Sequence, residues 1–371
     1  MKMKIIIDAR LYGSENGGLG RYVSNLITNL SRLDKSNNYI VLLRSKYYTR
    51  INLPSNWQKI KIDVRHYSFL EQLVVPWVLS WQRPDLVHFP HFNVPLLYFG
   101  RYVVTIHDLL MHQFRRNTTT TLPWLVFMIK RFGYWLSFKK AVNGALAIIV
   151  PSFFVKKELL AKYHIQPSRV SFVYEGVDTH LRLHDPKTIK TAVNDLAKKK
   201  FVLYVGNAYP HKNLSIFKSV FEKLPNLLVV MVIPRNVFME RLRRLFELEI
   251  KAGKVILLNH LTDSELVFLY RKATTFVFPS LAEGFGLPGL EAMSLGTPLV
   301  ASDIPVFHEV YREIPFYFDP KKSDELVTAI KKVNKLSFQQ RQQWTKRAKE
   351  LARHYSWSTL AKKTLEIYSS I

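Results

Sequence analysis

One segment decides the fold: Phe278-Pro279-Ser280-Leu281-Ala282-Glu283-Gly284-Phe285-Gly286-Leu287-Pro288-Gly289-Leu290-Glu291-Ala292-Met293. The apolar residues 275–278 predict the end of a buried strand, and the run 290–295 predicts a helix. The glycines and the proline between them predict a tight turn that leads into this helix. A helix N-terminus offers unpaired N–H groups and a positive dipole end, so it favours oxygen-rich or anionic ligands. The segment therefore predicts a strand, a glycine turn and a helix start that faces a ligand.

Two carboxylates bracket this turn, Glu283 before it and Glu291 inside the predicted helix. Carboxylates accept hydrogen bonds from hydroxyl groups, and a ribose or hexose is a ring of hydroxyls. The pattern alone fits a plain β–α connection equally well, with one glutamate capping the helix and the other on the surface.

The same residues resemble the signature of the family 4 retaining glycosyltransferases, which is Glu-Gly-Phe-Gly-Leu-Pro, two variable residues and Glu-Ala. Every position of that signature is matched, beginning at Glu283. The resemblance implies the GT-B fold, an α/β architecture in which two Rossmann-like domains with parallel sheets face each other across a cleft. It also implies that Glu283 contacts the donor sugar and Glu291 the nucleotide ribose. The turn backbone would contact donor hydroxyls and phosphate through Phe285, Gly286 and Leu287.

Composition agrees with a two-domain protein of the cell interior. The chain has 371 residues, 48% of them hydrophobic, which is enough for two ordinary domain cores. It has no cysteine, which excludes disulfides, thiolate catalysis and Cys-ligated metals, and fits a reducing compartment. The longest apolar run, 122–129, is far shorter than the roughly 20 residues that span a bilayer. We therefore expect a cytoplasmic protein without a membrane span.

The net charge of +26 and the pI of about 10.0 indicate an acidic partner. Nucleic acid, an anionic membrane surface and a nucleotide-sugar all qualify, and a generally basic proteome would give the same charge without any partner. Lysine and arginine are spread along the chain, and no nucleic-acid-binding module is recognisable. A basic nucleic-acid-binding protein is therefore the less favoured alternative.

Short apolar runs alternate with gaps of helical length, which predicts parallel sheets covered by helices. The first half contains runs at 4–8, 39–43, 60–64, 86–89, 102–107, 145–150 and 170–174. The second half contains runs at 201–205, 227–233, 255–258, 274–278, 298–301 and 315–318.

The polar, basic stretch 179–200 places the domain boundary. We predict an N-terminal acceptor-side domain at 1–180 and a C-terminal nucleotide-sugar domain at 181–355. The resemblance implies that a last helix, 356–371, crosses back to the N-terminal domain.

A glycine-rich loop follows the first predicted strand and leads into a helix. A flexible turn explains it as well as a ligand loop does. In the family the matching loop lies against the donor diphosphate or beside the acceptor. That role would fall on Gly18 first, and also on Gly17 and Arg21.

His107 stands at the carboxyl end of a predicted strand, where parallel sheets bind ligands. The resemblance implies that it contacts the donor sugar and orients the reacting centre, with Asp108 holding it in place. His88 and His91 lack an accompanying carboxylate, so we interpret them as lining the cleft rather than binding metal. Glu175 replaces the family's usual Asn, so no role is assigned to it.

Lys212 follows a strand at a predicted helix start, a good position for binding phosphate, although an ordinary solvated lysine is the alternative. The resemblance implies that Lys212 binds the diphosphate. Asn207 and His211 stand at donor-site positions where relatives often carry Arg, so His211 or Arg21 is expected to supply the missing cation. Leu261 matches the residue that lines the nucleobase.

The implied reaction transfers a hexose, mannose being the specific guess, from a nucleoside-diphosphate sugar to a saccharide or lipid-linked saccharide with retention of configuration. The sequence resembles bacterial mannosyltransferases of surface polysaccharide synthesis. The sequence contains no Asp-x-Asp, so neither a metal nor another cofactor is expected. An epimerase or a phosphorylase on the same fold is the other alternative, although no lysine site for a phosphorylase's pyridoxal group is recognisable.

The segment 122–140 interleaves aromatic and basic side chains, which suits the interface of an anionic bilayer. Packing into the domain core is the alternative, because the aromatic residues do not fall on one face. The first interpretation predicts a protein that is peripheral at the inner face of the cell membrane, with a lipid-linked acceptor. The residues concerned are Trp124, Phe127, Phe132, Tyr134, Trp135 and Phe138, with Lys130, Arg131, Lys139 and Lys140.

Overall fold

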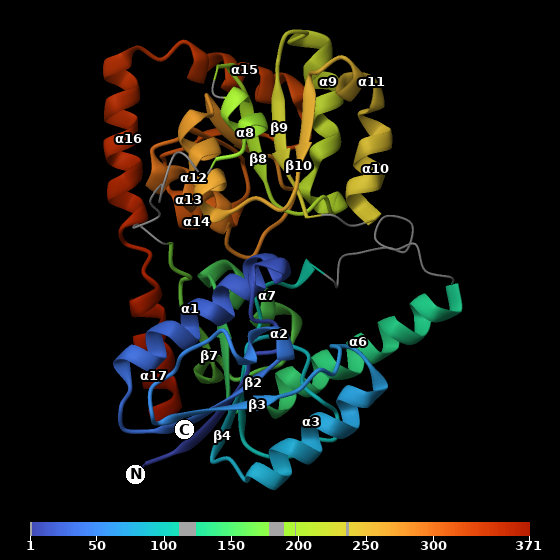
Figure 1. The fold of residues 1–371 in the computed structure, drawn as a ribbon, viewed down its shortest axis with the longest axis vertical. Helices are drawn as coiled ribbons and strands as arrows, with labels where there is room; N and C mark the ends of the chain where they lie inside the picture. Colours follow the sequence, from blue (N-terminus) through green and yellow to red (C-terminus); the bar gives the residue numbers. More distant parts are fainter. Residues whose placement is uncertain (1, 111–123, 178–188, 197, 235–236) are drawn as a thin grey trace. The chain divides into compact units, whose positions relative to one another are not determined.

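The computed structural model describes residues 2–110, 124–177, 189–196, 198–234 and 237–371. The chain divides into two compact units (Figure 1). The first unit consists of residues 1–176 together with 357–371, and the second consists of residues 177–356. The predicted boundary at 180 itself lies outside the described residues.

Within the described residues, the first unit contains a seven-stranded sheet in the order β3-β2-β1-β4-β5-β6-β7, and every strand pair is parallel. The central strands are almost wholly buried on both faces, as parallel sheets between helices require. The strands are β1 (Lys4–Asp8), β2 (Asn38–Leu43), β3 (Trp57–Lys61), β4 (Leu86–Phe89), β5 (Tyr102–Thr105), β6 (Ala147–Val150) and β7 (Val170–Phe172).

Helix α17 (Trp357–Ser369) belongs to the first unit and packs against α1 (Gly17–Leu33). Each helix buries apolar residues at helical spacing, Leu26 and Leu30 of α1 and Leu360 of α17 among them. The Tyr368 hydroxyl lies 2.5 Å from His88 Nδ1 on the central strand β4, which anchors the end of α17. The other α-helices in the described part of the unit are α2 (Ser45–Tyr48), α3 (Phe69–Gln82), α6 (Trp124–Gly144) and α7 (Phe153–Lys162).

The described part of the second unit contains a six-stranded parallel sheet in the order β10-β9-β8-β11-β12-β13. Its strands are β8 (Val202–Val205), β9 (Val229–Val232), β10 (Val255–Leu258), β11 (Thr275–Phe278), β12 (Leu299–Ser302) and β13 (Phe316–Phe318). Its helices are α8 (Thr191–Leu196), α9 (Phe217–Lys223), α10 (Val237–Leu245), α11 (Glu247–Lys251), α12 (Asp263–Lys272), α13 (Leu287–Leu295), α14 (Pro305–Tyr311), α15 (Ser323–Asn334) and α16 (Phe338–Ala352).

Two parallel-sheet α/β units confirm the predicted fold class. The strand order also shows where each unit can bind a ligand. In the second unit the chain adds β8, β9 and β10 in one direction across the sheet. It then returns to the centre and adds β11, β12 and β13 in the other direction. Such a switch point leaves a crevice beyond the carboxyl ends of the two adjacent strands. The loops that follow β8 and β11 are therefore the natural ligand site of this unit, and those after β1 and β4 are the equivalent in the first.

Candidate active site

The glycine turn after β11 adopts a backbone that only glycine fits well. Gly286 has φ +106° and is the N-cap of α13, and its carbonyl accepts a hydrogen bond from the buried Tyr311 hydroxyl. A Cβ atom on Gly286 would lie 2.2 Å from Tyr311 Oη, and one on Gly289 would lie 2.3 Å from the same atom. Because Tyr311 is fully buried, it has no room to move aside. The two glycines therefore let the N-terminus of α13 lie directly against α14.

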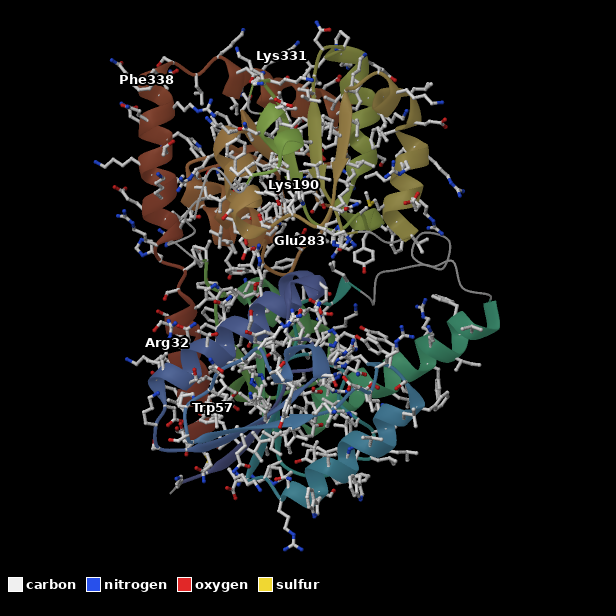
Figure 2. All side chains as sticks on the ribbon, viewed as in Figure 1. Arg32, Trp57, Lys190, Glu283, Lys331 and Phe338 are labelled. Atoms are coloured by element: carbon white, nitrogen blue, oxygen red, sulfur yellow. The ribbon has the colours of Figure 1, made fainter. Side chains whose placement is uncertain are left out.

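Lys212 and Glu283 are brought together at the switch point although they are 71 residues apart in the chain. Lys212 Nζ lies 2.6 Å from Glu283 Oε1, and the Ser280 hydroxyl donates to the same oxygen at 2.7 Å. The ammonium group also lies 5.6 Å from the centre of the Phe278 ring, within cation–π range. Glu283 is labelled in Figure 2.

A backbone hydrogen bond holds the two loops in register. Leu281 N, in the loop after β11, donates to His211 O, in the loop after β8, at 2.7 Å. Lys212 ends the short 3-10 helix Pro210–Lys212, and Asn213 follows with φ +56°. The side chains of Lys212 and Glu283 are 15% and 10% exposed, so the pair is mostly shielded from water yet still reachable. An ammonium has three N–H donors, so Lys212 can keep Glu283 and still bind an anion.

His211 is one of the two residues expected to supply an extra cation, and its surroundings disfavour the charged form of its ring. Burial, reinforced by the adjacent Lys212 charge, lowers the pKa of His211 to about 4, so the ring is neutral at pH 7. The ring stacks on Tyr209 with centroids 5.8 Å apart. The sequence does not show that this imidazole is buried beside a lysine. Asn207, also predicted here, accepts a hydrogen bond from the Tyr204 hydroxyl at its carbonyl, 2.6 Å away.

Glu291 lies on α13 and faces α12. Its carboxylate accepts a hydrogen bond from the Tyr270 hydroxyl at 3.1 Å, and the residue is 5% exposed. Leu261, predicted to line the nucleobase, is half-buried just before Thr262, the N-cap of α12. A reciprocal capping box between Thr262 and Glu265 fixes the start of this helix.

His107 follows β5 in the first unit, and both of its ring nitrogens have partners. Nδ1 lies 3.0 Å from Glu175 Oε1, and Nε2 lies 3.0 Å from the Pro90 carbonyl oxygen. A carbonyl only accepts, so Nε2 must carry a proton, and this fixes the orientation of the ring. The Tyr22 ring packs edge-on against the imidazole at 4.7 Å.

The partner of His107 is Glu175 and not Asp108, which corrects the sequence prediction. Asp108 instead accepts a hydrogen bond from the Leu110 backbone N–H at 3.0 Å, which stabilises its own turn. Glu175 is 6% exposed, and the sequence analysis gave it no role. The sequence did contain one signal of a role for Glu175, because it replaces the family's usual Asn. A carboxylate can hold an imidazole more firmly than an amide can.

The glycines at the start of α1 differ in what they do. Gly17 has φ +60°, and a Cβ on Gly20 would lie 1.8 Å from the Gly13 carbonyl oxygen, so Gly20 is required for packing. Gly18 is exposed, and a Cβ there would meet no atom within 4 Å. Packing alone therefore gives no reason for a glycine at position 18. Arg21 is half-buried one turn further along the helix.

His88 is a core residue, which corrects its assignment to the cleft. It is fully buried, with Nε2 2.8 Å from the Thr105 hydroxyl and Nδ1 bonded to Tyr368. Burial, with a smaller effect of His107, lowers the pKa of His88 to about 3. His91 is half-buried, and its Nδ1 lies 3.4 Å from the Tyr67 hydroxyl. In the part of the chain that the structure describes, no group of three or more His, Cys, Asp or Glu residues is placed to hold a metal ion.

Two parallel-sheet units, each with a glycine turn at a switch point, are the architecture of the GT-B glycosyltransferases. The family described as Glycosyltransferase Family 4 matches residues 16–181, and the family described as Glycosyl transferases group 1 matches residues 186–351. Together the two matches span most of the chain. The chain therefore belongs to the family 4 glycosyltransferases of the GT-B fold.

Similar proteins agree with this assignment. The chain is 28% identical over 274 residues to the O-antigen chain mannosyltransferase RfbU of Salmonella typhimurium, covering 73% of this chain and 70% of that protein. It is 26% identical over 316 residues to the O-antigen chain mannosyltransferase B of Escherichia coli, covering 82% and 79%. Among solved structures, Anabaena HepE in complex with UDP and glucose shares the fold, with a TM-score of 0.75 at 17% identity over 100% of both chains.

Proposed function

We propose that this protein is a retaining glycosyltransferase that moves a hexose from a nucleoside-diphosphate sugar to a hydroxyl of a saccharide or lipid-linked saccharide. The observation that carries the proposal is the Lys212–Glu283 pair beside the glycine turn at the switch point of the second unit. Mannose is the proposed sugar and GDP-mannose the proposed donor, supported by the mannosyltransferase names of the two relatives.

The proposed catalysis rests on stabilising the departing diphosphate. The Lys212 ammonium and the N–H groups at the start of α13 would face its negative charge. Glu283 would keep Lys212 in place and accept hydrogen bonds from sugar hydroxyls, while His107 would contact the donor sugar. The transition state would resemble an oxocarbenium ion. We propose a same-face attack in which the donor phosphate takes the acceptor's proton, with no carboxylate nucleophile.

A thermal-shift screen of nucleotide-sugars tests the proposed function. A true donor binds only the folded protein, so it raises Tm by mass action. GDP-mannose is expected to give the largest rise, followed by release of GDP when an acceptor is added, and NMR of the product would show a retained anomeric configuration. A rise with a different nucleotide-sugar would refute mannose only. No rise with any of them would contradict the function.

Glu291→Ala is expected to weaken nucleotide binding roughly tenfold and to change kcat little, because a ribose contact is almost the same in the ground and transition states. Glu283→Ala is expected to lower kcat as well, since charge develops on the sugar. Calorimetry with GDP and UDP measures the affinities. Tyr270→Phe is the matched control, because it removes the hydroxyl that donates to Glu291 and keeps the carboxylate. Unchanged affinity in Glu291→Ala would refute the ribose role.

Activity is expected to survive EDTA, because Lys212 and the α13 N-terminus would supply the positive charge that a divalent ion provides in other enzymes. The measurement is nucleoside diphosphate release before and after chelation. Loss of activity that added Mg²⁺ or Mn²⁺ restores would show that a metal cofactor is needed.

Glu175→Ala is expected to lower kcat by roughly tenfold or more while nucleotide affinity stays unchanged, because an imidazole without its Nδ1 partner can turn away from the productive position. Glu175→Gln keeps an oxygen that can accept from Nδ1 and is expected to restore most of the loss. The kcat and the calorimetric Kd of each variant are measured. A lower kcat with an unchanged Kd indicates a positioning role, whereas a change in both indicates general damage to the site. Equal kcat in Glu175→Ala and wild type would remove Glu175 from the mechanism.

The proposed location is cytoplasmic and peripheral at the inner face of the cell membrane, with a lipid-linked acceptor. Among the described helices, none is long and apolar enough to cross a bilayer. The aromatic residues predicted to touch membrane divide between two roles. Phe138 is buried and Tyr134 packs on the core, whereas Phe132 and Trp135 are exposed. The Trp124 side chain and residues 122–123 lie outside the described part of the structure.

A further inference from the structure

Helix α3 carries an apolar stripe that the sequence analysis did not single out. Phe69, Leu73, Trp77 and Trp81 recur every four residues, so they lie on one face of the helix. Phe69 is 87% exposed, Trp77 67% and Trp81 73%, and the two indoles stack with centroids 6.3 Å apart. Different residues of the same helix pack in the hydrophobic core, namely Val75, Val78 and Leu79. Single exposed apolar residues are ordinary, but a stripe of this kind marks an interaction surface.

The loop after β4 links helix α3 to α6. Leu96 N, in the loop after β4, donates to Gln72 Oε1 of α3 at 2.7 Å. The centre of the exposed Phe99 ring, in the same loop, lies 4.3 Å from Lys140 Nζ of α6. Both helices also pack on one shared hydrophobic core, and Figure 1 shows them in the first unit. We call the whole the docking surface, formed by Phe69, Leu70, Leu73, Trp77, Trp81, Leu97, Phe99, Met128, Ile129, Phe132 and Trp135.

Positive charges outnumber negative ones around the docking surface, where the exposed carboxylates are Asp63 and Asp85. Helix α6 contains no acidic residue, and the carboxylate of α3, Glu71, is buried against Arg10 at 2.7 Å. Asp85 is the acidic residue of the stretch 83–101. Lys139 lies 5.0 Å above the Trp135 ring, which joins the basic and apolar parts of the surface. The exposed cations are Arg65, Arg83, Arg101, Lys130, Arg131 and Lys139.

We propose that the docking surface binds an anionic phospholipid bilayer, with α3 as a principal contact beside α6. Trp and Phe favour the headgroup region, where the ring is shielded and the indole N–H stays wet. The surrounding cations fit anionic headgroups, while their stems cover apolar surface. A second copy of this chain fits less well, because a two-fold contact would set the same cations against each other. The inference deepens the proposed lipid-linked acceptor, yet it can be tested without any sugar donor.

Sedimentation with vesicles tests the proposal, using phosphatidylcholine alone and phosphatidylcholine mixed with phosphatidylglycerol. Wild type is expected to bind the mixed vesicles, to bind the neutral ones weakly, and to be released by salt. Trp77→Ala with Trp81→Ala is expected to weaken binding about tenfold or more, because binding scales with the apolar area buried in the interface. Leu248→Ala with Phe338→Ala is the matched control, since it removes two exposed apolar residues of the second unit and should change nothing. Phe338 is labelled in Figure 2.

A second pair of variants separates the contribution of the docking surface to vesicle binding from the contribution of the overall net charge. Lys130→Gln with Arg131→Gln is expected to weaken binding to the mixed vesicles roughly 25-fold, at about fivefold for each cation near the surface. Lys331→Gln with Lys332→Gln removes the same charge from α15 and is expected to leave binding nearly unchanged. Equal effects of the two pairs would mean that net charge alone drives adsorption, and this would overturn the assigned surface.

Two further outcomes would overturn the proposal. One is that wild type stays in the supernatant with both kinds of vesicle. The other is that wild type is a dimer in light scattering while the folded Trp77→Ala, Trp81→Ala variant is a monomer, which would make the surface an interface between copies. Donor-induced thermal shifts, measured without vesicles, report on glycosyl transfer separately. If wild type does not bind the vesicles but is stabilised by a donor, the proposed docking surface is wrong and the proposed function is unaffected.

Discussion

Lys212→Ala should reduce kcat/KM by roughly 100-fold or more, the loss of about 3 kcal/mol that follows removal of one charge-stabilising contact to a developing anion. The structure adds a second reason, because the variant also leaves Glu283 without the cation that lies 2.6 Å away. An unpaired carboxylate beside the expected diphosphate would repel the donor, so KM should rise together with the fall in kcat. Steady-state release of nucleoside diphosphate measures both constants.

Lys218→Ala is the matched control for this substitution. Lys218 also pairs with a glutamate, Glu249 at 2.8 Å, and lies 5.5 Å from the centre of a phenylalanine ring, Phe246. It is part of the same unit but does not belong to the switch-point loops. Its replacement should therefore lower stability to a similar extent and leave kcat/KM nearly unchanged. Near-normal turnover in a folded Lys212→Ala protein would remove Lys212 from the mechanism.

Gly286→Ala should destabilise the second unit by about 3 kcal/mol, combining the cost of a Cβ at positive φ with overpacking against Tyr311. For a unit of this size the expected fall in Tm is roughly 6–12 °C. The new methyl group would meet the Tyr311 hydroxyl and Phe307, both fully buried, so the start of α13 must shift. Scanning calorimetry or circular dichroism measures the fall.

Gly253→Ala separates backbone strain from crowding. Gly253 has φ +69°, but a Cβ there would meet no atom within 4 Å. Its replacement should therefore cost only about 1 kcal/mol of stability, from the positive φ alone. If the two variants melt at the same temperature, the contact between α13 and α14 does not restrict Gly286.

The fold was predictable because its signals are local. Apolar runs of strand length, glycine turns and helix starts lie within a few residues of each other. The Glu283–Glu291 segment indicated both the architecture and the family. The pairing of Lys212 with Glu283 was not predictable as a contact. It depends on β8 and β11 being neighbours, which is a property of strand order and not of either loop.

Surface and core could not be separated by periodicity in the helices of the first unit. In α3 apolar side chains occupy both faces, so the spacing cannot show that Val75 is buried and Trp77 exposed. In α6 the aromatic residues divide in the same way. Glu175 was missed for another reason, since a residue that departs from a family pattern gives no sign of which distant side chain it meets.

The placement of α17 has a consequence for how the polypeptide acquires its structure. The helix that packs on α1 and bonds to His88 is synthesised after the whole second unit, whereas α1 and β4 are synthesised before it. Until residues 357–369 have been synthesised, the side of α1 that packs on α17 is uncovered, and the nascent first unit is exposed to aggregation. The second unit, being continuous in sequence, can fold earlier as an inserted body. Completion of the first unit therefore waits for the docking of α17, and a chain that stops before Trp357 would leave this unit without that helix.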